Sequence, residues 1–143
     1  MSLSHSEVIQ LDVPASYYYL RLVSTCIEEL LTRMDNLSDR DILTYNIQLA
    51  THEVCTNIID HAYAGNPEGR IAMTLKLTPQ PAHIVIHLRD TGDTFDFLSI
   101  ADPDLDEVRE HGYGLFLIRS LMDQVIYNPD PSQNHWELVK YLA

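Results

Sequence analysis

The order of apolar and polar residues along the chain predicts alternating strands and helices. A period of two is typical of half-buried strands, and recurrence every three to four residues is typical of amphipathic helices. In chain order we expect a strand over 8–13, a helix from Pro14 to about Met34, a helix from Ser38 to about Ala62, strands over 71–77 and 84–88, a helix over 113–124, and a last strand pair over 125–127 and 136–142. The two middle strands are joined by the short segment 78–82, which predicts an antiparallel hairpin.

Turn signals separate these elements. Ser38 is followed three residues later by Asp41, a spacing typical of a capped helix start. The segment Gly65-Asn-Pro67-Glu-Gly69 ends the same helix, and the stretch 93–111 is acidic without a clear period. We find no internal repeat or linker. A chain of 143 residues with 45% hydrophobic composition therefore predicts one domain over 1–143 with its own core.

Composition narrows the classes of partner. Nine basic residues stand against twenty-one acidic ones, giving a formal charge of −12 that disfavours nucleic-acid backbone. The same charge is compatible with ATP, because Mg²⁺ bridges carboxylate-rich protein to phosphate, and it suits a partner with a basic surface. No apolar run is long enough for a membrane span and no secretion signal is evident. We expect a cytoplasmic protein in which Cys26 and Cys55 are reduced thiols lining the core.

One helix face carries candidate chemistry. Glu53, Asn57 and His61 are four residues apart, so a helix would place them along one side. They border an apolar stripe formed by Ile47, Ala50, Val54 and Ile58. Glu53 by itself fits a solvated helix face, and His61 fits a helix end. An interior helix Asn is less usual, however, and a carboxylate beside an amide oxygen suits a base next to a Mg²⁺ ligand.

Two further motifs follow downstream. Asp90-Thr-Gly92 ends an alternating strand, and it is either an ordinary turn or an acceptor for the exocyclic amine of adenine beside a glycine that lets the base approach. Gly112 and Gly114 open the next helix. They are either a plain helix start or a phosphate site made of free backbone amides.

Two other kinds of site are disfavoured. His52-Glu53 begins a zinc-protease motif, but the second histidine that this motif needs would stand at position 56, which is Thr. A serine hydrolase is also disfavoured, because the chain has no Gly-x-Ser-x-Gly segment.

In their order and spacing the three motifs resemble the GHKL ATP-binding superfamily, and within it the bacterial anti-sigma-factor serine kinases. The resemblance implies an α+β fold: a two-layer α/β sandwich of a mixed, mainly antiparallel sheet with helices on one face. It implies that Glu53 is the catalytic base and that Asn57 binds Mg²⁺. The residues that it places around the ATP cofactor are Asn57, His61, Asp90, Gly92, Arg109, Gly112, Tyr113, Gly114 and Leu115.

The chain departs from the superfamily pattern at two places. Position 93 is Asp where many members have a second glycine, and the segment 134–137 lacks the threonine often found before the last strand. The segment from Phe95 to His111, which would form the lid, is short, as in the switch-kinase branch. No phosphoacceptor-histidine helix precedes the domain, which disfavours an intact sensor kinase.

The resemblance implies a Mg-ATP-dependent serine/threonine kinase that phosphorylates an anti-sigma-factor antagonist and sequesters a sigma factor as a homodimer. Two alternatives remain open: a catalytically silent ATP-binding module that acts by partner capture, and a kinase of a circuit without a sigma factor. In the family the N-terminal strand and helix serve dimerisation and partner contact, where this chain has Tyr17-Tyr18-Tyr19 and Arg21. A tyrosine cluster at a helix start is also compatible with simple packing.

Overall fold

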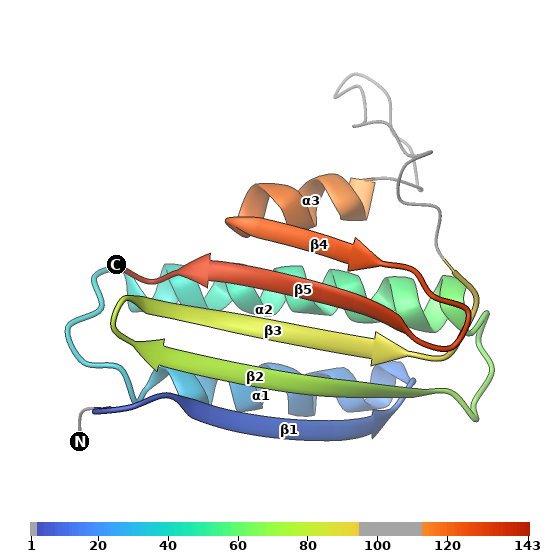
Figure 1. The fold of residues 1–143 in the computed structure, drawn as a ribbon, viewed down its shortest axis with the longest axis horizontal. Coiled ribbons are helices and arrows are strands. Elements are labelled where there is room, and N and C mark those ends of the chain that lie inside the picture. The colour runs from blue at the N-terminus through green and yellow to red at the C-terminus, as the bar shows by residue number, and fades with distance from the viewer. Residues whose placement is uncertain (1–2, 95–112) are drawn as a thin grey trace.

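A single antiparallel sheet with helices on one face organises the molecule (Figure 1). The computed structural model describes residues 3–94 and 113–143. The strands are β1 (Glu7–Pro14), β2 (Arg70–Pro79), β3 (Ala82–Asp90), β4 (Gln124–Asn128) and β5 (Asn134–Tyr141), in the sheet order β1-β2-β3-β5-β4. Every pairing within the described residues is antiparallel. The expected α+β class and the β2–β3 hairpin are confirmed.

The helices form the second layer. They are α1 (Leu20–Leu31), which follows a 3₁₀ turn over Tyr17–Tyr19, then α2 (Arg40–Asn57), which continues as a π-helix over Ile58–Ala62, and α3 (Tyr113–Leu121). In Figure 1, α1 and α2 lie behind the sheet. Helix α3 packs beside α2 and next to β4.

Two expected helix starts are wrong. Pro14 ends β1 instead of opening a helix, because it still pairs with Arg70 of the neighbouring strand. Ser38 is not the N-cap of α2. That position belongs to Asp39, which has a left-handed φ of 57° and makes no capping hydrogen bond through its side chain. Asn36, three residues before this cap, also has a positive φ, of 61°.

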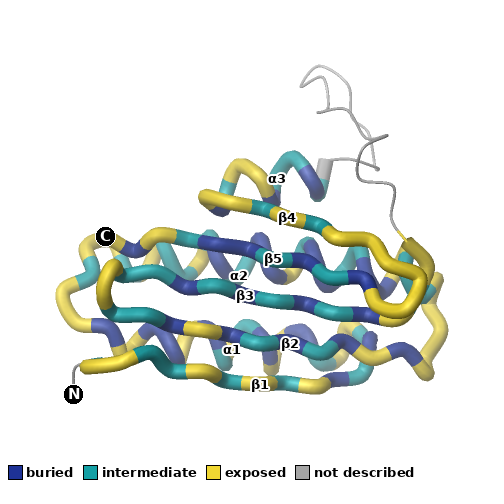
Figure 2. Tube along the Cα trace, in the orientation of Figure 1, coloured by how far each residue is buried: buried dark blue, intermediate teal, exposed yellow. Residues whose placement is uncertain are grey.

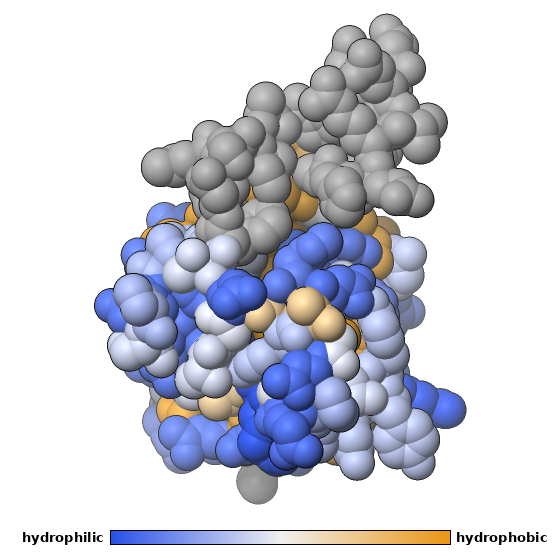
Figure 3. Space-filling model, turned by 90° about the vertical axis from the view of Figure 1, so that its right-hand side faces the viewer, coloured by the Kyte–Doolittle hydropathy of each residue, from blue (hydrophilic) through white to orange (hydrophobic). Residues whose placement is uncertain are grey.

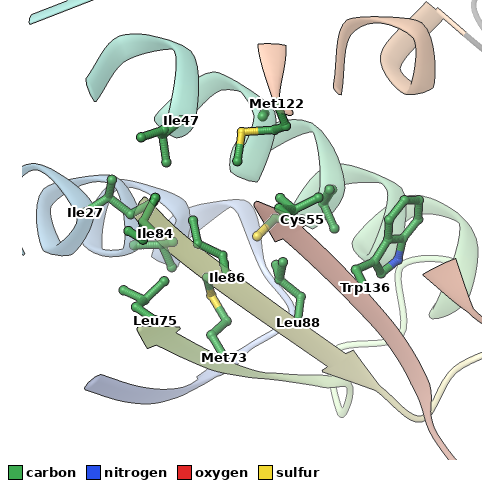
Figure 4. Close-up of a cluster of buried hydrophobic side chains, with 14 of the residues drawn as sticks. Ile27, Ile47, Cys55, Met73, Leu75, Ile84, Ile86, Leu88, Met122 and Trp136 are labelled. Atoms are coloured by element: carbon green, nitrogen blue, oxygen red, sulfur yellow. The ribbon is translucent and has the colours of Figure 1, made fainter. Parts of the chain in front are cut away.

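The core lies between the two layers (Figure 4). The inward-facing residues of β3 are fully buried, as are their counterparts on β2 and the apolar stripe of α2. Core residues of α1, α2, β2, β3 and β5 include Ile27, Ile47, Val54, Leu75, Ile84, Ile86, Leu88 and Trp136. Burying one such aliphatic side chain contributes about 1.5–3 kcal/mol. This packing fixes the position of the end of α2 relative to the end of β3.

The other face of the sheet is covered by neither α1 nor α2, and burial alternates along its strands (Figure 2). His87 on β3 and His135 on β5 lie on this face, with His87 Nδ1 2.7 Å from His135 Nε2. Their ring centroids are 4.9 Å apart and the rings are inclined by 20°. The rings therefore meet end to end, with one nitrogen donating to the other.

The two cysteines are free thiols in the described structure, as expected. Burial raises the pKa of Cys55 to about 12, and burial also raises the pKa of the partly buried Cys26. Because the thiolate is the reactive form, we expect iodoacetamide at pH 8 to modify Cys26 slowly and Cys55 only after unfolding. Mass spectrometry of peptides from native and denatured protein checks this. Equal labelling of both thiols in native protein would contradict the buried position of Cys55.

Within the described residues, no helix is both long enough and apolar enough to cross a membrane.

Candidate functional site

The motifs singled out in the sequence meet at one end of the molecule. In Figure 1 the last turn of α2, the end of β3 and the starts of β5 and α3 all lie at the right-hand end. Figure 3 views the protein from this side, and the described surface there is mainly hydrophilic. Helix, strand and turn thus contribute polar groups to a common region.

The first part of the site is the edge of α2 that faces the start of α3. Glu53 and Asn57 lie one turn apart on α2, and both residues are half-buried. A Cβ atom at Gly114 would lie 2.8 Å from Glu53 Oε2 and 3.9 Å from Asn57 Oδ1. The glycine therefore leaves room for the Glu53 carboxylate beside the first turn of α3, where a helix carries partial positive charge, and Asn57 Oδ1 lies within ordinary contact distance of the same place.

The chain changes helix type directly after Asn57. Residues Ile58–Ala62 form a π-helix, a rare conformation that is frequent at functional sites. His61 lies in this turn and is exposed. The regular α-helical spacing expected for Glu53, Asn57 and His61 therefore holds only as far as Asn57, and His61 belongs to the turn that leads away from the helix.

The second part of the site is the turn after β3. Asp90 is only 3% exposed, and its Oδ1 accepts hydrogen bonds from the Gly92 backbone N–H and from Asn134 Nδ2, each at 3.0 Å. Burial raises the pKa of Asp90, and these two hydrogen bonds lower it in part. A buried carboxylate with donors on one oxygen suits the recognition of a further donor.

A direct contact joins this turn to the end of α2. The Asp93 backbone N–H donates to Ala62 O at 2.7 Å. A Cβ atom on Gly92 would lie 2.3 Å from the same carbonyl oxygen, which no side chain could accommodate. Gly92 is therefore required for the approach of the turn to the π-helix. We had expected this glycine to make room for a base, and the contact with Ala62 is a second reason for it.

Two residues of this region were missed in the sequence. The Tyr63 hydroxyl donates to Arg70 O at 2.6 Å and accepts from the Thr91 backbone N–H at 2.9 Å, so it ties the turn to the start of β2. Asn134 is fully buried and bonds Asp90 across the sheet. Its residue type was visible in the sequence, but its burial and its position opposite Asp90, which give it a role, are seen only in the structure.

A tyrosine from the first connection reaches the same helix end. The Tyr17 hydroxyl donates to Asp60 Oδ1 in the π-helix. This hydrogen bond, together with burial and the charges of Asp60 and Glu53, raises the pKa of Tyr17 to about 12. The hydrogen bond places the 3₁₀ turn that precedes α1 next to the π-helix that continues α2. Tyr17 itself is about half exposed, at 53%.

The expected site residues between 109 and 115 lie partly outside and partly inside the described structure. Arg109 and Gly112 lie outside the described residues, as does the expected lid. Tyr113 begins α3, and Leu115 is buried in the core at 2% exposure.

The groups that are present fit a Mg²⁺-nucleotide. Carboxylate and amide oxygens such as those of Glu53 and Asn57 are hard ligands, and Mg²⁺ is commonly held by one or two of them together with phosphate oxygens. Between residues 3 and 94 and between 113 and 143, no three His, Cys, Asp or Glu side chains form a cluster that could hold a metal. Asp90 offers its buried carboxylate to a hydrogen-bond donor such as an amine.

Comparison with known proteins identifies the class. Residues 13–140 match the family model described as a histidine kinase-like ATPase domain. The chain therefore belongs to the histidine kinase-like ATPase family. Its relatives include the serine-protein kinases RsbW of Staphylococcus aureus, at 34% identity over 137 residues, and of Bacillus subtilis, at 27% over 130 residues. The first match covers 90% of this chain and 83% of the relative, and the second covers 85% and 78%. Within the family the chain is thus an ATP-using protein kinase of the RsbW group.

Solved structures agree on the fold. The structure of the RsbU and RsbW domains of a Mycobacterium tuberculosis protein superposes with a TM-score of 0.68 at 16% identity. This alignment covers 95% of the present chain and 32% of the longer one, so the chain spans about a third of that protein. A histidine kinase domain from Erythrobacter litoralis gives a TM-score of 0.56 at 15% identity, covering 91% and 62% of the two chains.

Proposed function

We propose that this protein transfers phosphate from Mg-ATP to a serine or threonine of an anti-sigma-factor antagonist, and that it binds a sigma factor when the antagonist is phosphorylated. The observation that carries the proposal is the meeting of Glu53, Asn57 and Gly114 at one edge of α2. The named RsbW relatives support the kinase class.

Glu53 and Asn57 have separate roles in this proposal. The half-buried Glu53 carboxylate orients the acceptor hydroxyl and takes its proton as the oxygen attacks. Asn57 Oδ1 is a ligand of Mg²⁺. Bound Mg-ATP would supply the γ-phosphoryl group, with ADP as the leaving group, and the metal would supply positive charge that neutralises the phosphates during transfer. The first turn of α3, beside Gly114, contributes backbone amides and the positive end of its dipole.

Asp90 determines which base is bound. Its Oδ1 already accepts from Gly92 and Asn134, and we assign the acceptor for the exocyclic amine of adenine to its second oxygen, Oδ2. The position of Asp90 on the rigid end of β3 supports this assignment, because strands hold a polar group more accurately than loops do.

The exposed surface around the start of α1 and the family resemblance both support a protein partner. Tyr17, Tyr18 and Leu22 are exposed around the start of α1, with Tyr18 at 83% exposure. Exposed aromatic side chains often anchor protein contacts. We assign this region to contact with a protein partner, and we propose that the protein acts as a homodimer in the cytoplasm.

The metal-ligand assignment predicts a specific defect. We expect Asn57→Ala to weaken Mg-ATP binding about 10- to 100-fold, since an oxygen contact with a charged group is worth about 1.5–3 kcal/mol. Binding of ATP in the presence of EDTA should change little. Isothermal titration calorimetry with and without Mg²⁺ measures both, and Asn46→Ala on the same helix is the matched control.

The kinase proposal is tested by incubating the protein with radiolabelled ATP and each candidate anti-sigma-factor antagonist. We expect phosphate on a serine or threonine of the antagonist, and sigma-factor binding that depends on the phosphorylation state. The proposal should be abandoned if no cognate antagonist is labelled and Asn57→Ala binds Mg-ATP as well as the wild type. Capture of a sigma factor without phosphate transfer would instead support the silent binding module.

A further inference from the structure

Asn134 is a buried polar residue that the proposed chemistry does not yet use. It is the first residue of β5, lies opposite Asp90 in the strand register and is 0% exposed. Its Nδ2 donates to Asp90 Oδ1 at 3.0 Å, to Gly92 O at 3.0 Å and to Asp93 O at 3.2 Å. Its Oδ1 accepts from the Asp130 backbone N–H at 3.2 Å. Partners on both sides of the amide leave only one orientation for it.

These hydrogen bonds favour the ionised carboxylate of Asp90, which acts as a hydrogen-bond acceptor. An ionised carboxylate only accepts hydrogen bonds, whereas a protonated one also donates. Burial favours the protonated form of Asp90, and the N–H groups of Asn134 and Gly92 oppose this. Since an amide does not titrate, Asn134 donates at every pH. It thus favours the carboxylate without adding a charge of its own.

We propose that Asn134 is the positioning residue of the base-binding end of the site, holding Asp90 as an oriented hydrogen-bond acceptor so that the site selects a purine with an exocyclic amine over one with a carbonyl at the same place. The inference rests on the proposed nucleotide binding and adds its specificity. It also accounts for the missing threonine near the last strand, because Asn134 supplies a donor at that place.

Two other carboxylates lie close to the hydrogen bond between Asn134 and Asp90, but they do not affect the pKa of Asp90. Asp93 and Asp130 lie on the two connections that meet here, and both are exposed. Neither is a cause of the pKa shift of Asp90, which comes from burial, Asn134 and Gly92.

The neighbours along the strands face the other way. Arg89 precedes Asp90 and His135 follows Asn134, and strand alternation points both toward the uncovered face of the sheet. Arg89 Nη1 lies 3.4 Å from Thr74 Oγ1, and His135 contacts His87. The donor to the Asp90 side chain from β5 is therefore Asn134.

A pair of variants with the same shape isolates the donor. Asn134→Thr replaces the amide N–H by an O–H that can donate to Asp90, and Asn134→Val has the shape of threonine without a donor. Binding of ATP and of inosine triphosphate, which carries a carbonyl in place of the amine, is measured by calorimetry between pH 5.5 and 8.5. Thermal unfolding confirms that each variant is folded. Asn128→Val, at an exposed position of β4, is the matched control.

We expect the Val variant to bind ATP about 10- to 30-fold more weakly at pH 7 and to lose most of its preference over inosine triphosphate, while Thr recovers most of both. Without the amide, burial raises the pKa of Asp90 further. Affinity for ATP should therefore fall at a higher pH in Val than in the wild type as the solution is acidified. If Val does not fold, Asn134→Ser and Asn134→Ala form an equivalent pair.

The outcomes distinguish a failure of nucleotide binding from a failure of the role of Asn134. Wild-type protein that binds neither nucleotide overturns nucleotide binding itself, and this inference with it. Wild-type protein that binds ATP, with Thr and Val identical in affinity, selectivity and pH profile, overturns the role of Asn134 alone and reduces it to packing.

Discussion

Glu53→Gln is expected to lower phosphate transfer about 10²- to 10⁴-fold while Mg-ATP binding stays near the wild-type value. The substitution keeps the length and hydrogen-bonding capacity of the side chain but removes its ability to take a proton. General base catalysis typically contributes about 10²- to 10⁴-fold to the rate. Asn57 Oδ1, beside Glu53 in the structure, remains to hold the metal. Single-turnover transfer to the antagonist and calorimetric titration with Mg-ATP measure the two quantities separately.

The control for this experiment is Glu28→Gln, which removes the same charge from an exposed position of α1. It should transfer phosphate at the wild-type rate. Full activity in Glu53→Gln would exclude Glu53 as the base. Equal loss of transfer and of Mg-ATP binding would show that the carboxylate holds the metal instead of the proton.

Gly92→Ala is expected to be the most damaging small substitution in the site. Its Cβ atom would lie 2.3 Å from Ala62 O and 2.5 Å from Ala62 C, and backbone cannot move aside as a flexible side chain can. Overpacking of this kind costs about 1–3 kcal/mol of stability. Displacement of the turn also moves Asp90, so ATP affinity should fall along with the unfolding midpoint. Chemical denaturation and nucleotide titration of the same sample test both effects.

Two other glycines provide comparisons. At Gly65 the φ of +77° makes an alanine strained, but no described atom beyond the chain neighbours lies within 4 Å of the added Cβ. Gly65→Ala should therefore cost only about 1 kcal/mol and leave nucleotide binding unchanged. At Gly114 a Cβ would meet the end of the Glu53 side chain, which can rotate. Gly114→Ala should therefore slow transfer with little loss of stability. Equal stability of Gly92→Ala and the wild type would contradict the Ala62 contact.

The strands and the central parts of the helices could be predicted because the sequence patterns that indicate them are local. Alternation along β2 and β3 reflects one buried and one uncovered face, and Ile84, Ile86 and Leu88 are all fully buried as their period implies. The ends of helices were predicted less well. Pro14 was expected to begin a helix and instead completes β1, since pairing with β2 outweighs the local preference. Ser38 was expected to be the N-cap of α2, but the next residue, Asp39, takes that position with a positive φ.

The candidate site divides in the same way. Glu53, Asn57, Asp90 and Gly114 were proposed from residue type, spacing and the family resemblance, and the structure brings Gly114 beside the first two. Asn134 could not be assigned from sequence, because its importance depends on lying opposite Asp90, which is distant along the chain. The loss of helical register after Asn57 also had no sequence signal that we recognised.

By itself, then, the amino-acid sequence determined the kinds of element, the three polar motifs and the resemblance to an ATP-using kinase. These depend on periodicity and on residues within a few positions of each other. Only the tertiary structure decided which of these groups meet, because hydrogen bonds and close contacts such as Asn134 to Asp90 and Gly92 to Ala62 join segments from different elements. Their geometry depends on how helices and sheet pack, which no local pattern specifies.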